Sequence, residues 1–199
     1  MNFSETLWPD NARDLELLYE EFVARATALG TEVYRVSDLA EARELVCRLI
    51  REMGVKKVAL AGSPFISALD LAAALAGAGV EVAGGNPRER AGAADLGISS
   101  FEMAIAETGT LVQDATEINR RLVSMLPPVH LALVPTGRLV GTLREAINSL
   151  ADRGQIPGYL AFVSGPSRTA DIERVLTIGV HGPGKVVVVF VDEGGGAGE

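Results

Sequence analysis

The most constraining feature of the sequence is an almost unbroken run of valine near its C-terminus. Residues 185–192 read KVVVVFVD, with no alternation between apolar and polar side chains. A strand with one solvent-facing side alternates, whereas a strand covered on both faces by helices is apolar throughout. The run therefore predicts a strand buried on both faces, as in the interior of a parallel sheet.

The rest of the chain supplies the other elements that such a sheet requires. Helical spacing of apolar residues predicts helices in residues 11–29, 37–54, 67–76 and 139–150. Short apolar runs predict strands in residues 31–36, 58–61, 80–82, 129–134 and 159–163. This alternation predicts an α/β fold, a three-layer and mostly parallel sheet with helices on both faces.

The domain organisation follows from length and composition. A chain of 199 residues suits one substantial core, and no repeat is visible. We expect an N-terminal helical extension in residues 1–35, one α/β domain in residues 36–193 and a disordered tail in residues 194–199. Residues 83–94 are rich in glycine and arginine without apolar periodicity, so they are predicted to form a mobile surface loop.

The turns that follow parallel strands lie along one edge of the sheet, where ligands usually bind. The turns at Gly62, Gly84, Thr136 and Ser164 are therefore expected to share this edge. The hairpin at Glu107 is expected near it.

Charge and cysteine content exclude several classes of function. The formal net charge of −8 argues against a nucleic-acid partner, because phosphate binding requires clustered Lys and Arg. Cys47 is the only cysteine, so this chain alone cannot form a disulfide or supply the cysteines of a zinc or iron–sulfur centre. No apolar run is long enough to span a bilayer, and residues 1–8 do not resemble a secretory signal. We expect a cytoplasmic protein.

Residues 164–173, with the sequence SGPSRTADIE, form the first candidate ligand site. They are predicted to be the turn between a strand and a helix, with Ser167 or Thr169 capping that helix. Arg168 is the one permanent cation in the turn itself, and its planar donor fork suits a small carboxylate.

Two roles for Arg168 stay open. Its guanidinium either binds a small anionic ligand or pairs with Asp171 or Glu173 of its own helix, as surface arginines commonly do. In the first case, the expected ligand-binding residues are Thr108, Gly109, Thr110, Ser164, Gly165, Ser167, Arg168, Thr169 and His181.

Glu107 is the candidate catalytic residue. It begins the sequence ETGT between two apolar runs, which predicts a tight hairpin with Gly109 at positive φ. Burial there would raise the pKa of Glu107 towards the range of a general base or nucleophile. The alternative is that Glu107 and Thr108 hydrogen-bond the backbone of the turn.

Several other patterns resemble known functional sites but do not meet the requirements of those sites. Residues 179–185 have the glycine and lysine spacing of a phosphate-binding loop, but Val186 replaces the required hydroxyl and the lysine opens a strand. Residues 165–169 resemble a nucleophile elbow without its final glycine, so a serine hydrolase is not expected. No metal is expected at His130 or His181, although His181 lies in a Gly-rich turn that could meet a ligand.

Three segments in this order resemble the LUD-domain family, specifically its short LutC (YkgG-type) lactate utilisation proteins. They are AIAETGT at 104–110, SGPSRTADIE at 164–173 and GVHGP at 179–183. Arg120 and Arg121, with LPPVH at 126–130, also match the family pattern. The resemblance covers roughly residues 36–191.

The resemblance implies a fold similar to the NagB/RpiA/CoA-transferase superfamily. It also implies a role in oxidising L-lactate to pyruvate, beside partner subunits that carry iron–sulfur centres. This chain fits the cluster-free accessory subunit, without a cofactor of its own. The alternative is an isomerase or a CoA/acyl-transfer-type enzyme in which Glu107 acts on a small anionic substrate. The sequence departs from the family at residues 113–119, where relatives usually carry a more Gly-rich turn.

Overall fold

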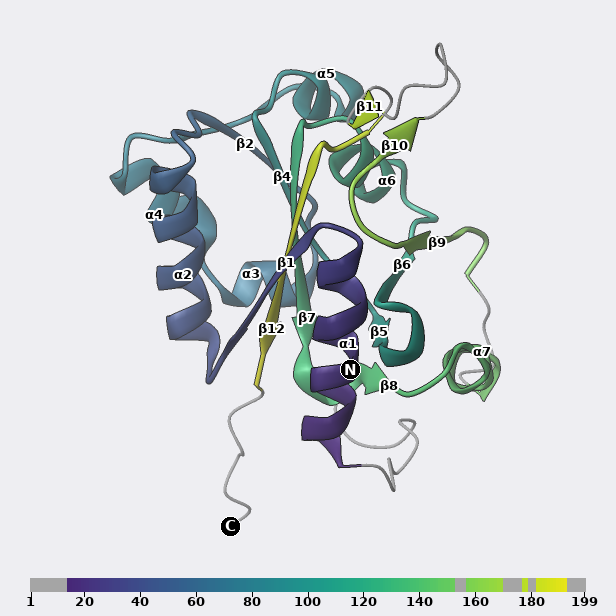
Figure 1. The fold of residues 1–199 in the computed structure, drawn as a ribbon. Coiled ribbons are helices and arrows are strands. Elements are labelled where there is room, and N and C mark those ends of the chain that lie inside the picture. The colour runs from purple at the N-terminus through teal and green to yellow at the C-terminus, as the bar shows by residue number, and fades with distance from the viewer. Residues whose placement is uncertain (1–13, 153–156, 170–176, 179–181, 193–199) are drawn as a thin grey trace.

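A parallel sheet of six strands forms the centre of the computed structural model, which describes residues 14–152, 157–169, 177–178 and 182–192 (Figure 1). The strand order is β1-β12-β7-β4-β2-β3, and every neighbouring pair is parallel. The strands are β1 (Thr31–Val36), β2 (Lys57–Leu60), β3 (Glu81–Val82), β4 (Leu96–Ser100), β7 (Val129–Pro135) and β12 (Lys185–Val191).

β12 lies between β1 and β7 and is the buried strand that the valine run predicts. Val187 and Val189 belong to the core cluster on one face of the sheet. Val186, Val188 and Phe190 belong to the cluster on the other face. Burying a side chain of this kind stabilises the fold by on the order of 2 kcal/mol.

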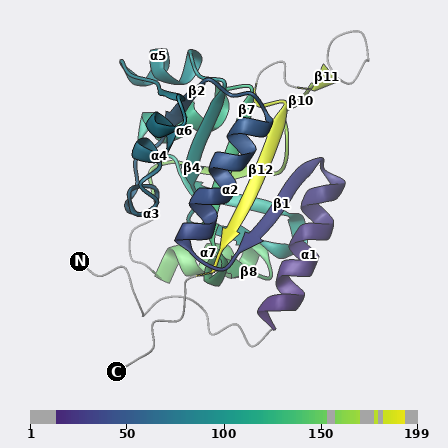
Figure 2. The ribbon, with the colours of Figure 1, turned by 90° about the vertical axis from the view of Figure 1, so that its left-hand side faces the viewer.

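Helices cover both faces of this sheet (Figures 1 and 2). One face carries α2 (Leu39–Glu52), α3 (Pro64–Ala68) and α4 (Leu71–Gly77), which share a core cluster with β12. The other face carries α1 (Leu15–Ala28), α5 (Pro87–Gly92) and α6 (Ile118–Met125). The predicted α/β architecture is confirmed.

A second, smaller sheet is part of the layer that contains α1. Its order is β8-β5-β6-β9, with strands β5 (Met103–Ile105), β6 (Thr110–Asp114), β8 (Leu139–Val140) and β9 (Leu160–Val163). The single-turn helix η1 (Ala106–Thr108) joins β5 to β6, which are antiparallel. Gly109 follows at a φ of 61°, so the predicted hairpin is confirmed.

The predicted loop in residues 83–94 is wrong, because α5 occupies its centre. The Asn86 side chain accepts hydrogen bonds from the backbone N–H groups of Arg88 and Glu89. The Glu89 side chain accepts in return from Asn86 N, which completes a capping box. A helix of six residues has too few turns to show apolar periodicity, but its start signal, Asn-Pro-x-Glu, is present in the sequence.

Two predicted helices have different limits in the structure. The helix expected over residues 139–150 begins only at Leu143 as α7 (Leu143–Asp152), because Leu139 and Val140 pair with β5. A short helical turn, η2 (Thr136–Arg138), precedes that pairing. The helix expected over residues 67–76 is two helices, α3 and α4, divided at Asp70, which has a φ of 46°.

The segment around Ser164 does not lie where the sequence predicts it. β9 is antiparallel to β6 in the second sheet, so its turn does not join the turns of the parallel sheet. The helix predicted from Thr169 is wrong at its start, because β10 (Arg168–Thr169) pairs with β11 (Thr177–Ile178). Asp171 and Glu173 lie outside the described residues. An apolar run of five residues does not reveal which sheet it will join.

The N-terminal elements share the core of the main sheet. β1 is its edge strand, and the Phe22 ring packs edge-on against Phe190 of β12 at a centroid distance of 5.0 Å. Arg35 of β1 joins α1 to the end of β12, since it pairs with Glu16 at 2.7 Å and with Asp192 at 2.9 Å. Within the described part of the chain, no helix is long and apolar enough to cross a membrane.

Candidate functional site

The predicted hairpin and the predicted Ser164 turn meet at the C-terminal end of α1. A side chain at Gly109 would lie 2.6 Å from the backbone nitrogen of Ala26, so the hairpin approaches α1 at a distance that only glycine permits. Gly165, with a φ of 80°, lies against Leu29 just beyond that helix. The hydroxyl groups of Thr110 and Ser164 join the two segments through a hydrogen bond of 2.7 Å.

Arg168 stabilises this junction. Its Nη2 donates a hydrogen bond of 2.6 Å to the carbonyl oxygen of Leu29, the C-cap residue of α1. A cation at this end also interacts favourably with the helix dipole. The described contacts therefore give Arg168 a structural partner, and its predicted pairing with Asp171 or Glu173 lies outside the described residues.

Glu107 is exposed, in contrast to the burial expected from the sequence. Its Oε1 accepts a hydrogen bond of 2.7 Å from the backbone N–H of Leu143, the first residue of α7. Acceptance from a first-turn N–H stabilises a helix start. Thr108 beside it is also exposed. The geometry favours helix capping of α7 by Glu107, whereas the alternative interpretation of the sequence was a hydrogen bond to the backbone of its own turn.

The remaining predicted residues are only partly described. The backbone N–H of Ser167 donates 2.9 Å to the carbonyl of Pro183, so the third predicted turn does approach the Ser164 segment. Thr169 is described only as backbone in β10, and His181 lies outside the described residues. The structure thus brings together Gly109, Thr110, Ser164, Gly165 and Arg168, while Glu107 contacts α7.

A second group of polar residues lies where β2 and β4 end. These strands are neighbours, but β2 leads to α3 on one face of the sheet and β4 leads to the second sheet on the other. Ligands of open α/β sheets bind where adjacent strands leave the carboxyl edge towards opposite faces. We call this group the switch point. It comprises Ser63, Ser100, Glu102, Asn119 and Arg120.

Two hydroxyl groups connect the strand ends at the switch point. Ser100 Oγ donates 2.8 Å to Ser63 Oγ, which also accepts from the backbone N–H of Ile66 and so caps α3. With its lone pairs engaged, Ser63 can still donate its own proton to a ligand.

A mostly buried ion pair forms the opposite side of the switch point. Arg120 Nη2 donates to Glu102 Oε1 at 2.6 Å and to the carbonyl of Ser100 at 3.0 Å. The side chains of Arg120 and Glu102 are 13% and 21% exposed. Glu102 Oε2 also accepts from Asp114 N at 2.6 Å, which fixes the pair to the second sheet.

Asn119 has unused hydrogen-bonding capacity. Its Nδ2 donates a long bond of 3.5 Å to the carbonyl of Leu60 at the end of β2. Its Oδ1 is buried and has no hydrogen-bond partner among the described residues, as is also true of Arg120 Nε. Buried polar atoms without a partner are uncommon in native proteins and often bind water or a ligand.

Behind the switch point, a buried histidine joins the polar network. His130 Nε2 and Ser99 Oγ share a hydrogen bond of 2.9 Å, and Gln113 Nε2 donates to Ser99 Oγ at 3.1 Å. Burial lowers the pKa of His130 to about 4, so the imidazole is neutral at physiological pH. These contacts make His130 a hydrogen-bonded core residue.

The switch point combines hydrogen-bond donor and acceptor groups. It offers the Ser63 hydroxyl, the Asn119 carbonyl and the Arg120 cation. Among the described residues, no group of three or more His, Cys, Asp or Glu side chains could hold a metal ion. Of this group, the sequence had indicated only the turn at Gly62 and, through the family resemblance, Arg120. Two features of the sequence could have indicated the rest of the switch point. Ser99 and Ser100 end an apolar strand, and Asn119 and Arg120 lie at the start of a helix.

A parallel sheet with a polar cluster at its switch point is the arrangement of a ligand-binding α/β protein. The chain belongs to the LUD domain family, whose profile matches residues 19–191.

Curated relatives with sequence similarity bear the name lactate utilization protein C. The chain is 39% identical to that of Shouchella clausii over 108 residues, which are 53% of this chain and 47% of the relative. It is 42% identical to lactate utilization protein C 1 of Bacillus mycoides over 105 residues, 51% of this chain and 45% of the relative. The matches therefore span about half the length of these relatives.

A solved structure supports the fold. The crystal structure of a DUF162 family protein from Deinococcus radiodurans superposes with a TM-score of 0.65. The match covers 90% of this chain and 99% of the other, at 23% sequence identity. At this identity the similarity concerns the architecture alone.

Proposed function

We propose that this chain acts in lactate utilisation, as an accessory subunit without a metal cluster beside partners that carry iron–sulfur centres. The similarity to lactate utilization protein C supports the pathway. The single cysteine in 199 residues supports the assignment of the iron–sulfur centres to the partners, since cluster ligation requires several thiolates. Oxidation of L-lactate to pyruvate is the reaction that we assign to the complete system.

The role that we propose for this subunit is to bind a small carboxylate at the switch point. The observation that carries this proposal is the buried Oδ1 of Asn119, which has no partner among the described residues. A 2-hydroxy acid such as lactate matches the available groups. Its hydroxyl can donate to Asn119 Oδ1, and its carboxylate can accept from the Ser63 hydroxyl and from Arg120 Nε, which has no partner among the described residues.

A catalytic role for Glu107 receives less support from the geometry. A general base or nucleophile gains reactivity from a shielded environment, whereas Glu107 is exposed and bonded to the start of α7. Glu107→Gln retains an oxygen that can accept from Leu143 N, so the variant should support lactate oxidation and lose less than about 1 kcal/mol of stability. Loss of activity in a folded Glu107→Gln protein would favour the acyl-transfer or isomerase alternative.

The pathway assignment is tested by genetics. Deleting the gene from its host should abolish growth on L-lactate as sole carbon source while growth on pyruvate continues. The intact gene should restore growth. Undiminished growth of the deletion strain on L-lactate would contradict the pathway assignment.

The binding site is tested separately, by calorimetric titration of the purified protein with L-lactate. Asn119→Ala should weaken binding about tenfold, corresponding to the loss of one hydrogen bond of about 1.4 kcal/mol. Asn148→Ala, an exposed asparagine on α7, is the matched control and should bind like the wild type. Equal affinity of all three proteins would exclude Asn119 as a contact and leave the pathway assignment untouched.

A further inference from the structure

Two groups of the switch point can act towards a ligand only as hydrogen-bond donors. Ser63 Oγ already accepts from Ser100 Oγ at 2.8 Å and from the backbone N–H of Ile66 at 3.1 Å. Both of its lone pairs are therefore engaged, and its hydroxyl can only donate to a further partner. A guanidinium has no acceptor atom, so Arg120 Nε can also only donate.

Asn119 supplies an acceptor. The orientation of its side-chain amide is defined, because Nδ2 donates to the carbonyl oxygen of Leu60, which can only accept. Oδ1 is thus the atom left without a partner among the described residues, and Asn119 is only 7% exposed. A buried acceptor that receives no hydrogen bond is unfavourable, so a ligand that covers Oδ1 should donate to it.

The arginine of the switch point is held in place by its neighbours. Arg120 Nη2 donates to Glu102 Oε1 at 2.6 Å and to the carbonyl of Ser100 at 3.0 Å. The same carbonyl accepts from Gln113 Nε2 of the second sheet at 3.2 Å, so both of its lone pairs are used. Ser63, Arg120 and Asn119 therefore present two donors and one acceptor.

This polarity distinguishes a 2-hydroxy acid from the 2-keto acid that forms when it is oxidised. Both acids carry the same carboxylate, which can accept from the two donors. The hydroxyl of the 2-hydroxy acid supplies the donor for Asn119 Oδ1. The ketone oxygen of the 2-keto acid can only accept, so in the same position it faces Oδ1 with no proton between the two oxygens. A site built to receive a hydroxyl rejects an analogue that lacks it, because the buried partner is left unpaired.

We propose that Asn119 is the specificity-determining residue of the switch point and makes it select a 2-hydroxy acid such as L-lactate over the corresponding 2-keto acid. This inference rests on the carboxylate binding proposed above. A site with this preference binds the substrate of the oxidation and releases its product, so the oxidised acid does not compete for the subunit.

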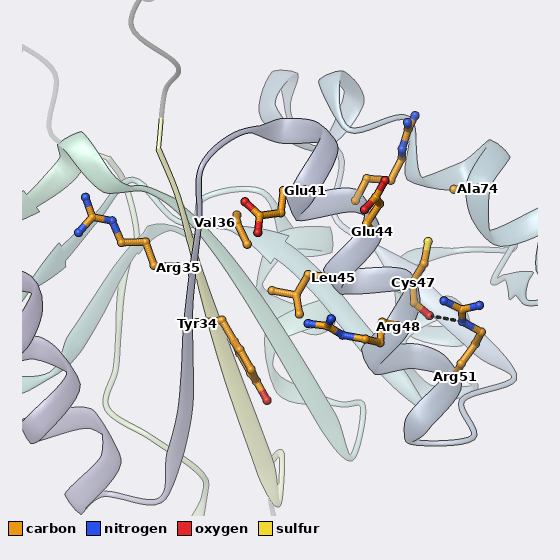
Figure 3. A pocket seen from close by; sticks show the side chains of 11 residues that line it. Tyr34, Arg35, Val36, Glu41, Glu44, Leu45, Cys47, Arg48, Arg51 and Ala74 are labelled. Atoms are coloured by element: carbon orange, nitrogen blue, oxygen red, sulfur yellow. Dashed lines mark hydrogen bonds between the residues drawn. The ribbon is translucent and has the colours of Figure 1, made fainter.

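A hollow outside the switch point supplies one control. It encloses about 500 Å³ between β1, α2 and α4 (Figure 3). Its charged lining includes Glu41, Glu44, Arg43, Arg48 and Arg51. The three arginines are exposed and can attract an organic carboxylate, so they test whether the acids bind there instead. Arg48→Gln/Arg51→Gln should leave the affinities for both acids unchanged.

The test is calorimetric titration of the purified protein with L-lactate and, separately, with pyruvate at pH 7.5. The wild type should bind L-lactate at least about tenfold more tightly than pyruvate. Asn119→Leu keeps the approximate size of the side chain but removes its acceptor. It should lose about tenfold in affinity for L-lactate and less than about threefold for pyruvate, so the preference should largely disappear. Asn148→Leu, at an exposed position of α7, should keep the wild-type preference.

Equal affinity of the wild type for the two acids, or a preference for pyruvate, would overturn the role of Asn119 while carboxylate binding at the switch point would stand. A wild-type preference that persists in Asn119→Leu would assign the discrimination to another group and overturn the role as well. No binding of either acid by the wild type, or binding that is lost in Arg48→Gln/Arg51→Gln, would contradict both this inference and the binding role on which it rests. Asn119→Ala replaces Asn119→Leu if circular dichroism shows that the leucine variant is unfolded.

Discussion

Replacing His130 by leucine should reduce the loss of folding stability that the protein undergoes at acidic pH. The imidazole is completely buried between the parallel sheet and the second sheet, where it bonds Ser99 and contacts the Phe101 ring at a centroid distance of 5.7 Å. Burial penalises its charged form and lowers its pKa from 6.5 to about 4.

The magnitude follows from proton linkage. Between pH 6.5 and 4 the unfolded chain protonates His130 while the folded chain does not, so unfolding takes up a proton. The free energy of unfolding therefore falls as the pH falls. At about 1.4 kcal/mol per pKa unit, the loss is about 2 kcal/mol at pH 5 and levels off near 3 kcal/mol below pH 4. It vanishes above pH 7, where both states are neutral.

Urea unfolding followed by circular dichroism at pH 7.5 and pH 5.0 measures this effect. The free energy of unfolding of His130→Leu should fall between the two pH values by about 2 kcal/mol less than that of the wild type. The carboxylates also titrate as the pH falls, but they are the same in both proteins, so their contribution cancels in the comparison. Ser99→Ala loses the hydrogen bond but keeps the buried imidazole, so its drop should match the wild type. An equal drop in His130→Leu and the wild type would refute the reasoning that burial keeps His130 neutral.

Two further substitutions test the packing around the candidate sites. Gly109→Ala should lower the free energy of unfolding by at least about 2 kcal/mol, since it strains a positive φ and places a methyl group 2.6 Å from Ala26 N. Gly77→Ala, with open space around the new methyl group, should stay within about 1 kcal/mol of the wild type; equal melting temperatures for both variants would contradict the contact with α1. Glu102→Gln should cost on the order of 2 kcal/mol by leaving Arg120 mostly buried without a counter-charge. Glu81→Gln, in the exposed pair with Lys57, should cost less than about 0.5 kcal/mol in the same denaturation assay, and similar losses in both would show that the Arg120 pair is solvated.

The parts of the fold that the sequence predicted were those set by local pattern. The valine run of β12 could be assigned to the sheet interior because no solvent-facing strand tolerates such a composition. Gly109 could be assigned a positive φ because the hairpin between two apolar runs requires it. The capping box of α5 was also readable, but its few residues carry no periodicity to support it.

The errors arose where long-range pairing decides the structure. Residues 160–163 form a strand as predicted, yet only the contacts with β6 assign them to the second sheet. Thr169 pairs with Thr177 in an antiparallel strand, although its sequence resembles a helix start. The switch point was missed for the same reason, because Ser63, Ser100 and Asn119 meet only through the strand order.

The proposed ligand site is tested most directly by nuclear magnetic resonance titration of the isotope-labelled protein with L-lactate. The account predicts saturable shifts of backbone amides in residues 62–66, 99–102 and 117–121, which surround the ends of β2 and β4. Residues 107–110 and 164–168, at the end of α1, should shift much less. Shifts confined to those latter residues, or no saturable shifts at all, would contradict a carboxylate site between β2 and β4.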